Sequence, residues 1–302
     1  METLMFEGQN EIEFLKRFST EAQCNEHLYQ YKWSKGFLCP HCNSTEEHQC
    51  KRLYHKRCKK CLRIFSAANN TLFHKVKFSL VKAFYIVFKM SATTKSVSAE
   101  QMSKMIGINR KSALLFQQKI RVAMKSSEQY PLSGQVEVDE AFIGGKEEGK
   151  IGRGAEKKTQ IVIAIEKYGD KGLKRMYAKV IKDASSQELQ GIFDKHISKV
   201  ATILTDKWRG YSQIAEKFNI RQEKSEPDKN FKVMHRSIQQ LKSWIRGIHH
   251  SVDPVYLQGY LDEFCYRINR SQHKNSIFEN LIQRMVEGIP ITKNKIKFCY
   301  SL

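Results

Sequence analysis

The sequence predicts a multidomain chain of mixed α+β and α/β class, and three observations lead to this prediction. Two closely spaced cysteine pairs stand in the N-terminal part of the chain. After them the spacing of apolar residues becomes helical, and beyond residue 130 short alternating or apolar runs favour strands. A length of 302 residues is enough for two or three modules with a buried core.

The composition is strongly basic, with a formal net charge of +21. A field of this size attracts polyanions, so we expect nucleic acid as the partner. The longest apolar run, residues 78–88, is interrupted by Lys82 and is too short to span a bilayer. No secretory leader pattern opens the sequence. We therefore expect a cytoplasmic chain without membrane association, whose eight cysteines bind metal rather than form disulfides.

The strongest local signal is two C-x-x-C pairs separated by residues 43–57, and its members are Cys39, Cys42, Cys58 and Cys61. This spacing is typical of a closed zinc site, in which four thiolates satisfy one tetrahedral Zn²⁺. A mixed site is the alternative, because further possible ligands lie nearby: His41, Cys50 and His55. A redox C-x-x-C is the other alternative, but no βαβ pattern surrounds the pairs. We expect a zinc ribbon over residues 31–77, after a helical lead over residues 1–30.

Between Lys32 and Lys77, eleven Lys or Arg residues face two Glu, with aromatic residues interleaved. This composition favours a ribbon that binds nucleic acid. Residues 78–130 are then predicted to be helical. Within them, a capping box at Ser98 opens a short helix that ends at Gly107. The next helix opens with Arg110 and Lys111, and the pair has the outline of a helix-turn-helix, so we expect Arg110 and Lys111 to contact nucleic acid.

Two aspartates stand at the ends of strand-like runs. Val136 and Val138 alternate with Glu137 and Asp139, which predicts a strand with Asp139 near its end, on the face opposite the valines. The apolar run 200–205 ends in Asp206. Each aspartate alone is equally typical of a turn or a helix cap.

The order of the predicted elements brings these two aspartates together. Strands over 159–166 and 173–181, a helix over 186–198 and the strand before Asp206 follow the first strand. A fourth strand that lies parallel beside the first gives the plan of an RNase H-like domain with a mixed five-stranded sheet. Asp139 and Asp206 would then face each other at one edge, an arrangement that suits divalent ions and phosphoryl transfer.

The chain resembles bacterial insertion-sequence transposases of the DDE type, in the insertion-sequence 1595 family of ISXO-type proteins. The resemblance covers about residues 20–275. Its motifs in this sequence are the two C-x-x-C pairs with Tyr31-Lys32-Trp33 and Gly36-Phe37-Leu38 before them, Val136-Glu137-Val138-Asp139-Glu140, Gly144-Gly145-Lys146, Leu204-Thr205-Asp206, Gly210-Tyr211, Leu241-Lys242-Ser243-Trp244, Gly247-Ile248-His249-His250 and Tyr260-Leu261-Asp262-Glu263-Phe264.

The resemblance implies two catalytic Asp, a third metal-site residue and a Lys seven positions after it. Asp139 and Asp206 match the first two, and Lys242 matches the Lys, which places the third position at His235. Many family members have Asn or Glu there, and imidazole suits softer ions than Mg²⁺. A carboxylate supplied by Glu263 or Asp262 is therefore the alternative.

Helical spacing supports His235 independently of the resemblance. Four polar residues recur at i, i+4, i+7 and i+11, namely His235, Gln239, Lys242 and Arg246. A parallel apolar stripe contains Met234, Ile238, Leu241 and Ile245. We expect the apolar face to pack on the sheet, with Lys242 and Arg246 close to DNA phosphates. A solvated Lys is the alternative.

The resulting hypothesis is a DNA transposase that cleaves strands and joins them to a target with two Mg²⁺ or Mn²⁺ ions. We expect a catalytic domain over 131–288, a basic tail over 289–302 that is a strand or an arm, and a homo-oligomer on the terminal inverted repeats and target DNA in a bacterial cytosol. A catalytically silent DNA-binding descendant is the alternative function. A ribonuclease or junction nuclease of the same fold would leave the zinc module unexplained.

Overall fold

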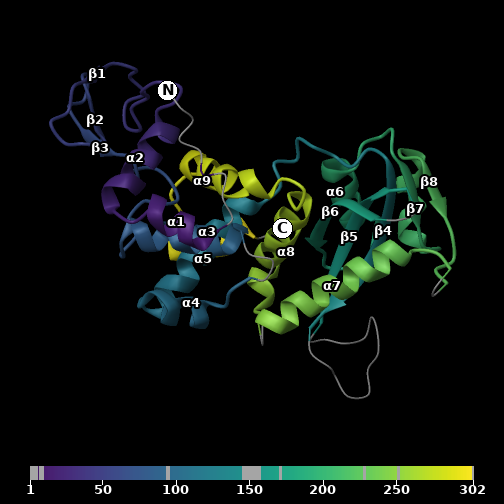
Figure 1. The fold of residues 1–302 in the computed structure, drawn as a ribbon. Coiled ribbons are helices and arrows are strands. Elements are labelled where there is room, and N and C mark those ends of the chain that lie inside the picture. Colours follow the sequence, from purple (N-terminus) through teal and green to yellow (C-terminus); the bar gives the residue numbers. More distant parts are fainter. Residues whose placement is uncertain are drawn as a thin grey trace. The chain divides into compact units, whose positions relative to one another are not determined.

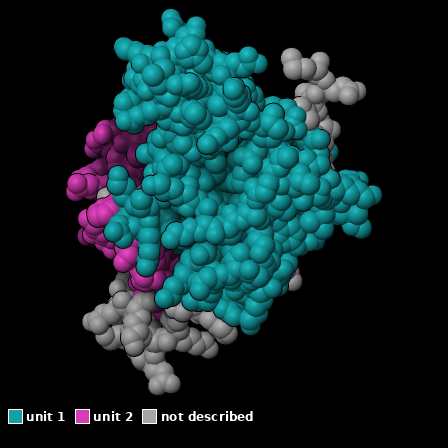
Figure 2. Space-filling view, turned by 90° about the vertical axis from the view of Figure 1, so that its left-hand side faces the viewer, with its two compact units in different colours: residues 1–124, 272–296 teal, residues 125–271, 297–302 magenta. Residues whose placement is uncertain are grey.

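The chain folds into two compact units, which Figure 2 colours separately. Unit 1 contains residues 1–124 and 272–296, and unit 2 contains residues 125–271 and 297–302. The computed structural model describes residues 6, 10–92, 96–144, 158–169, 172–226, 229–249 and 252–300.

Unit 1 begins with two helices, α1 (Glu11–Arg17) and α2 (Glu21–Lys32). Thr20 and Gln23 form a reciprocal capping box that starts α2. Phe14 and Phe18 are buried, whereas Ile12 is 65% exposed. The predicted helical lead therefore consists of two helices, and only part of its apolar pattern faces a core.

A small antiparallel sheet follows, with strand order β1 (Glu47–His48), β2 (His55–Cys58) and β3 (Ile64–Ser66). Three helices complete the continuous part of unit 1, namely α3 (Leu80–Ala92), α4 (Ala99–Ile106) and α5 (Arg110–Met124). The side chain of Ser98 caps α4, and Gly107 ends it with φ +61°, a conformation that glycine adopts without strain. Both predicted helices and the turn between them are thus present.

The C-terminal helix α9 (Ile277–Glu287) returns to unit 1, where it packs against α2, α3 and α5. Phe278 is buried there, with its ring 5.6 Å from that of Phe14 and 6.2 Å from that of Phe84. The domain predicted over 131–288 therefore differs from unit 2 at its end, because the apolar face of α9 is covered by the helices of unit 1.

The predicted basic tail is helical from residue 293 to residue 299, with α10 (Lys293–Ile296) and the 3₁₀ turn η4 (Lys297–Cys299). Ile296 and Tyr300 are buried, which fixes this segment. The expectation of a strand or an arm is therefore wrong for these residues. The buried apolar side chains between the lysines supply the physical reason.

Unit 2 is built on a mixed five-stranded sheet of strand order β6-β5-β4-β7-β8 (Figure 1). Its strands are β4 (Gln135–Ile143), β5 (Thr159–Tyr168), β6 (Gly172–Val180), β7 (Thr202–Thr205) and β8 (Ile220–Gln222). The first three are antiparallel neighbours, and β7 lies parallel to both β4 and β8. This confirms the predicted mixed sheet and the parallel pairing of its first and fourth strands.

Helices cover both faces of this sheet (Figure 1). On one face α6 (Ser186–His196) packs over Val136 and Val138. On the other face α7 (Lys232–Ile248) and α8 (Pro254–Asn269) pack over Ala141 and Ile143. Alternate residues of β4 thus belong to two different cores, as the period of two along a strand requires.

Candidate catalytic and metal sites

The two predicted aspartates are neighbours at the place where β4 and β7 part. The parallel pairing runs from Gln135 with Thr202 to Val138 with Thr205. Asp139 and Asp206 are the next residue on each strand, so the register brings their side chains together. Asp206 follows the end of β7, as predicted.

Asp139 itself is not near the end of its strand, contrary to the prediction. β4 continues for four residues to Ile143, because β5 pairs with it over this whole length. What ends at Val138 is only the pairing with β7. The open place beside Asp139 is therefore created by the shortness of β7.

Glu140 joins the two aspartates, and the sequence did not identify it. One carboxylate oxygen from each of Asp139, Glu140 and Asp206 lies within 4.8 Å of the others. Strand alternation places Glu140 on the face of β4 opposite Asp139, so the pattern gave no reason to group them. The available signal was the direct succession of two acids at the point where a neighbouring strand ends. We call these three residues the carboxylate cluster.

The environment of Asp139 opposes its ionisation. Burial raises the pKa of Asp139 to about 6, and the nearby Asp206 and Glu137 carboxylates act in the same direction. The amide N–H of Glu140, which donates to Asp139 Oδ1 at 2.8 Å, and the Lys242 ammonium oppose this rise. Carboxylates crowded in this way are stabilised by a cation, and hard oxygen ligands are those that Mg²⁺ prefers. The donor set fits a divalent ion.

Helix α7 carries Lys242, whose charge acts on Asp139. The predicted apolar stripe of α7 packs on the sheet. Its buried members are Met234, Ile238, Leu241 and Ile245. Burial lowers the pKa of Lys242, Arg246 lowers it further, and Asp139 raises it. Asp139 and Lys242 thus influence each other's ionisation. Arg246 lies one turn further along α7 and is exposed.

His235 lies outside the carboxylate cluster. Its Nε2 is 3.3 Å from the Ser225 hydroxyl, in the segment that follows β8. The two alternative acids are also elsewhere, on α8, which packs against β6. Glu263 is fully buried and pairs with Arg267 at 3.1 Å, and Asp262 accepts a hydrogen bond from Gln258 at 3.0 Å. In the described residues, the structure brings neither of these acids into the cluster.

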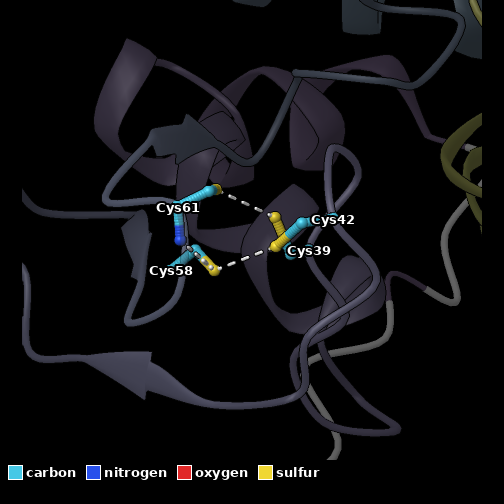
Figure 3. Close-up of side chains that lie close together, drawn as sticks. All are labelled: Cys39, Cys42, Cys58 and Cys61. Atoms are coloured by element: carbon cyan, nitrogen blue, oxygen red, sulfur yellow. Dashed lines mark hydrogen bonds between the residues drawn. The ribbon is translucent and has the colours of Figure 1, made fainter.

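The four cysteines of the C-x-x-C pairs converge (Figure 3). Cys39 Sγ is 3.6 Å from Cys61 Sγ, and Cys42 Sγ is 3.5 Å from Cys58 Sγ. Tetrahedral zinc with Zn–S bonds of about 2.3 Å separates sulfurs by about 3.8 Å, so the donor set fits structural zinc. Backbone amides face two of the sulfurs, and the N–H of Cys61 lowers the pKa of Cys58 to about 6, which favours the thiolate that zinc requires.

The predicted mixed ligands are not part of this group in the described residues. His55 Nδ1 lies 2.7 Å from the carbonyl oxygen of Leu53, and Cys50 lines a separate hollow with His48 and Tyr54. The spacing of the cysteines therefore selected the four side chains that converge.

Arg110 and Lys111 are both exposed in the first turn of α5. The Asn109 side chain accepts from the amide of Lys111 at 2.8 Å, which fixes the start of the helix. Arg110 Nε lies 3.4 Å from a carboxylate oxygen of Glu100 on α4. The two basic side chains thus stand together at the turn between α4 and α5, within unit 1.

Comparison with known proteins finds similarity to proteins of mobile elements. Residues 131–269 match the family model described as the ISXO2-like transposase domain. The chain is 22% identical over 218 residues to an uncharacterized protein in transposable element ISH50 of Halobacterium salinarum, covering 67% of this chain and 72% of that protein. No helix among the described residues has the length and apolar character needed to cross a membrane.

A likeness also exists to a chain in the cryoEM structure of a simian T-cell lymphotropic virus intasome in complex with PP2A regulatory subunit B56 gamma. It has 12% sequence identity and a TM-score of 0.30, and it covers 61% of this chain. The match spans about two thirds, 65%, of the length of that chain.

Proposed function

We propose that the chain is a DDE-type transposase, because residues 131–269 match the family model described as the ISXO2-like transposase domain. It cleaves a phosphodiester at the end of an insertion sequence, which releases a 3′-hydroxyl. That hydroxyl then attacks a phosphodiester of target DNA, forming the new bond as the target strand leaves. The order and directions of the strands in unit 2 support an RNase H-like domain as the scaffold.

The carboxylate cluster carries this proposal, because it gathers negative oxygens in a chain of formal net charge +21. Asp139 and Asp206 would hold two divalent ions, either Mg²⁺ or Mn²⁺. When bound, such ions activate the attacking oxygen and stabilise the leaving oxygen. Asp139 must be ionised to take part, and Lys242 assists by favouring its charged form.

Other residues of unit 2 position the DNA. The charges of Lys242 and Asp139 act on each other, so we propose that the Lys242 ammonium meets a phosphate close to the reacting bond. Arg246 extends the same basic face of α7. His235, two turns before Lys242, matches the third position of the family motif, and its imidazole faces the Ser225 hydroxyl.

Unit 1 is proposed to recognise DNA. The four-cysteine group, a proposed zinc ribbon, and helices α4 and α5, a proposed helix-turn-helix, both lie in it, and Arg110 and Lys111 are accessible at the turn. Phosphate contacts by such residues set the position of a protein on DNA, whereas base contacts select the sequence. We propose that unit 1 binds the terminal inverted repeats, with the active assembly a homo-oligomer on DNA.

A catalytically silent DNA-binding protein is the competing function. A silent descendant has no physical need to hold Asp139 and Asp206 together, because clustered acids repel each other and destabilise the metal-free fold. The cluster is complete, which favours the enzyme.

Asparagine variants of the two aspartates test the proposed function. Asp139→Asn and Asp206→Asn retain side-chain size and remove the charge that holds a cation. We expect Mg²⁺-dependent cleavage of a duplex carrying the DNA that flanks the coding region to fall by at least about 100-fold, a loss like that from removing one transition-state contact. Affinity for the same duplex should stay at the wild-type level.

Asp194→Asn is the matched control, because Asp194 is exposed on α6 and accepts a hydrogen bond from Gln190 of the same helix. Its cleavage rate should equal that of the wild type. Wild-type cleavage by both cluster variants would contradict the proposal.

A further inference from the structure

Tyr211 is fully buried and binds the carboxylate cluster directly. Its hydroxyl donates a hydrogen bond to Glu140 Oε1 at 2.6 Å. Hydrogen bonds to charged oxygens at this length are among the stronger ones in proteins. Burial raises the pKa of Tyr211 well above its ordinary value, and Glu140, Asp139 and Asp206 add to the rise. The hydroxyl therefore keeps its proton and remains a donor to Glu140.

The segment from Asp206 to Tyr211 is built to hold this hydroxyl in place. A Cβ on Gly210 would lie 2.5 Å from the carbonyl oxygen of Ala184, so the backbone approaches closer there than any side chain permits. Trp208 Nε1 donates to the same carbonyl oxygen at 2.8 Å, and the Ser186 hydroxyl donates to the Gly210 carbonyl at 2.7 Å. These bonds tie the segment to the start of α6.

The same segment also fixes Asp206. The amide of Trp208 donates to Asp206 Oδ1 at 3.2 Å, and Gln222 Nε2 on β8 donates to the Asp206 carbonyl at 3.1 Å. Asp206 and Tyr211, the hydrogen-bond partner of Glu140, thus lie in one loop that several hydrogen bonds hold in place. The positions of the Asp206 and Glu140 carboxylates depend on this loop.

Helix α7, in contrast, brings no carboxylate to this edge. Its sequence contains neither Asp nor Glu, and His235 faces the Ser225 hydroxyl. Mg²⁺ takes oxygen ligands in preference to imidazole. A site that lacks an acid on α7 therefore needs another oxygen, and among the described residues Glu140 is the acid grouped with both aspartates.

We propose that Glu140 supplies the third carboxylate for the catalytic divalent ions and that Tyr211 is a positioning residue that holds it there. This inference rests on the proposed function, since it concerns the same site. It assigns roles to two residues outside the Asp, Asp and third-position pattern.

Two matched variants separate the charge from the hydrogen bond. Glu140→Gln keeps an oxygen that Tyr211 can bind but removes the negative charge. Tyr211→Phe keeps the buried ring and the charge of Glu140 but removes the bond. The measurement is the affinity of the full zinc-loaded chain for Mn²⁺. Electron paramagnetic resonance detects the Mn²⁺ that remains free.

We expect Glu140→Gln to weaken Mn²⁺ binding by at least about 10-fold, and Tyr211→Phe to weaken it by about 10-fold, the lower end of the range for groups that orient ligands. Glu216→Gln and Tyr168→Phe are the controls, because both side chains are exposed in unit 2. Both controls should bind Mn²⁺ as the wild type does.

Wild-type Mn²⁺ affinity of Glu140→Gln would overturn the inference, and wild-type affinity of Tyr211→Phe would overturn the role of Tyr211. A greater loss for His235→Ala than for Glu140→Gln would return the third ligand to α7 and also overturn it. Asp139→Asn distinguishes the two levels. If it loses Mn²⁺ while Glu140→Gln does not, only this inference fails, whereas Mn²⁺ binding unchanged in Asp139→Asn contradicts the proposed function.

Discussion

Asp139 gives unit 2 a pH-dependent stability that can be measured without DNA. Its folded-state pKa of about 6 exceeds the ordinary value of 3.8. Protonated Asp139 therefore stabilises the fold, an effect that is fully present below the unfolded pKa and lost as the pH rises through about 6. In buffer without added Mg²⁺ or Mn²⁺, the free energy of unfolding of unit 2 should decline over this window.

This decline can be measured by urea unfolding at a series of pH values. Hydrogen exchange of β4 and β5 reports the unfolding of unit 2. Asp139→Asn does not titrate, so the difference between it and the wild type isolates the contribution of this residue. Asp194→Asn should follow the wild-type profile. Identical profiles for Asp139→Asn and the wild type would contradict the buried position of the Asp139 carboxyl.

The local sequence pattern was sufficient to select Asp139 and Asp206 as site candidates, but it did not select Glu140. Each aspartate follows a strand-like run, and its face on the strand can be read from alternation. Glu140 reaches the cluster only because β7 ends at Thr205 and leaves the flank of β4 open. The length of a neighbouring strand is a long-range property that alternation within β4 does not contain.

Among the elements, the zinc ribbon is predicted to be a locally cooperative module. Cys58 is the last residue of β2, and its sulfur accepts a hydrogen bond from the amide N–H of Cys61. This sulfur therefore links the sheet to the turn of the second C-x-x-C pair. Cys58→Ser should release the one zinc expected per chain, and it should remove hydrogen-exchange protection from β2 and β3, because zinc binding is coupled to folding. Protection of β4 and β5 in unit 2 should not change.

Elemental analysis of the purified chain gives the zinc content, and exchange mass spectrometry gives the protection. Cys24→Ser is the control, since Cys24 is buried in α2 away from the four ligands. Full zinc content in the Cys58→Ser chain would contradict the four-thiolate site.

Helix α9 is predicted to stabilise unit 1 although it follows unit 2 in the sequence. Phe278 is 1% exposed, and its ring packs against those of Phe14 and Phe84. Phe278→Ala should lower the free energy of unfolding of unit 1 by about 3–5 kcal/mol, the usual cost of truncating a buried Phe. Exchange protection of α3 and α5 should fall, whereas that of β4 and β5 should not.

Phe298→Ala is the control, because Phe298 is 76% exposed on η4. Loss of protection in β4 and β5 on truncation of Phe278, with α3 and α5 unaffected, would instead place α9 with unit 2, as the sequence had suggested.

The sequence predicted the elements better than their assignment to units. The caps at Ser98 and Gly107, the alternation in β4 and the apolar stripe of α7 are all encoded within a few residues. Whether α9 packs on unit 1 or unit 2 depends on which distant surface buries Phe278. No pattern within α9 carries that information.

For the whole molecule, the proposed function gives the formal net charge of +21 and the cluster of acids in unit 2 different roles. The basic charge would attract DNA at long range, and the acids would act only on the bond that is cut. This division predicts that substitutions can abolish cleavage without affecting DNA binding. A protein that only bound DNA would need the basic charge but not the carboxylate cluster.

The most direct test of the transposase assignment is a strand-transfer reaction analysed by sequencing. The purified full-length chain is incubated in Mg²⁺ with a duplex carrying the DNA that flanks its coding region and with a circular target plasmid. We predict junctions in which the 3′ ends of that duplex are joined to the plasmid, and their absence with Asp139→Asn or Asp206→Asn. DNA binding without any junctions from the wild-type chain, or equal junctions from both Asn variants, would contradict the account.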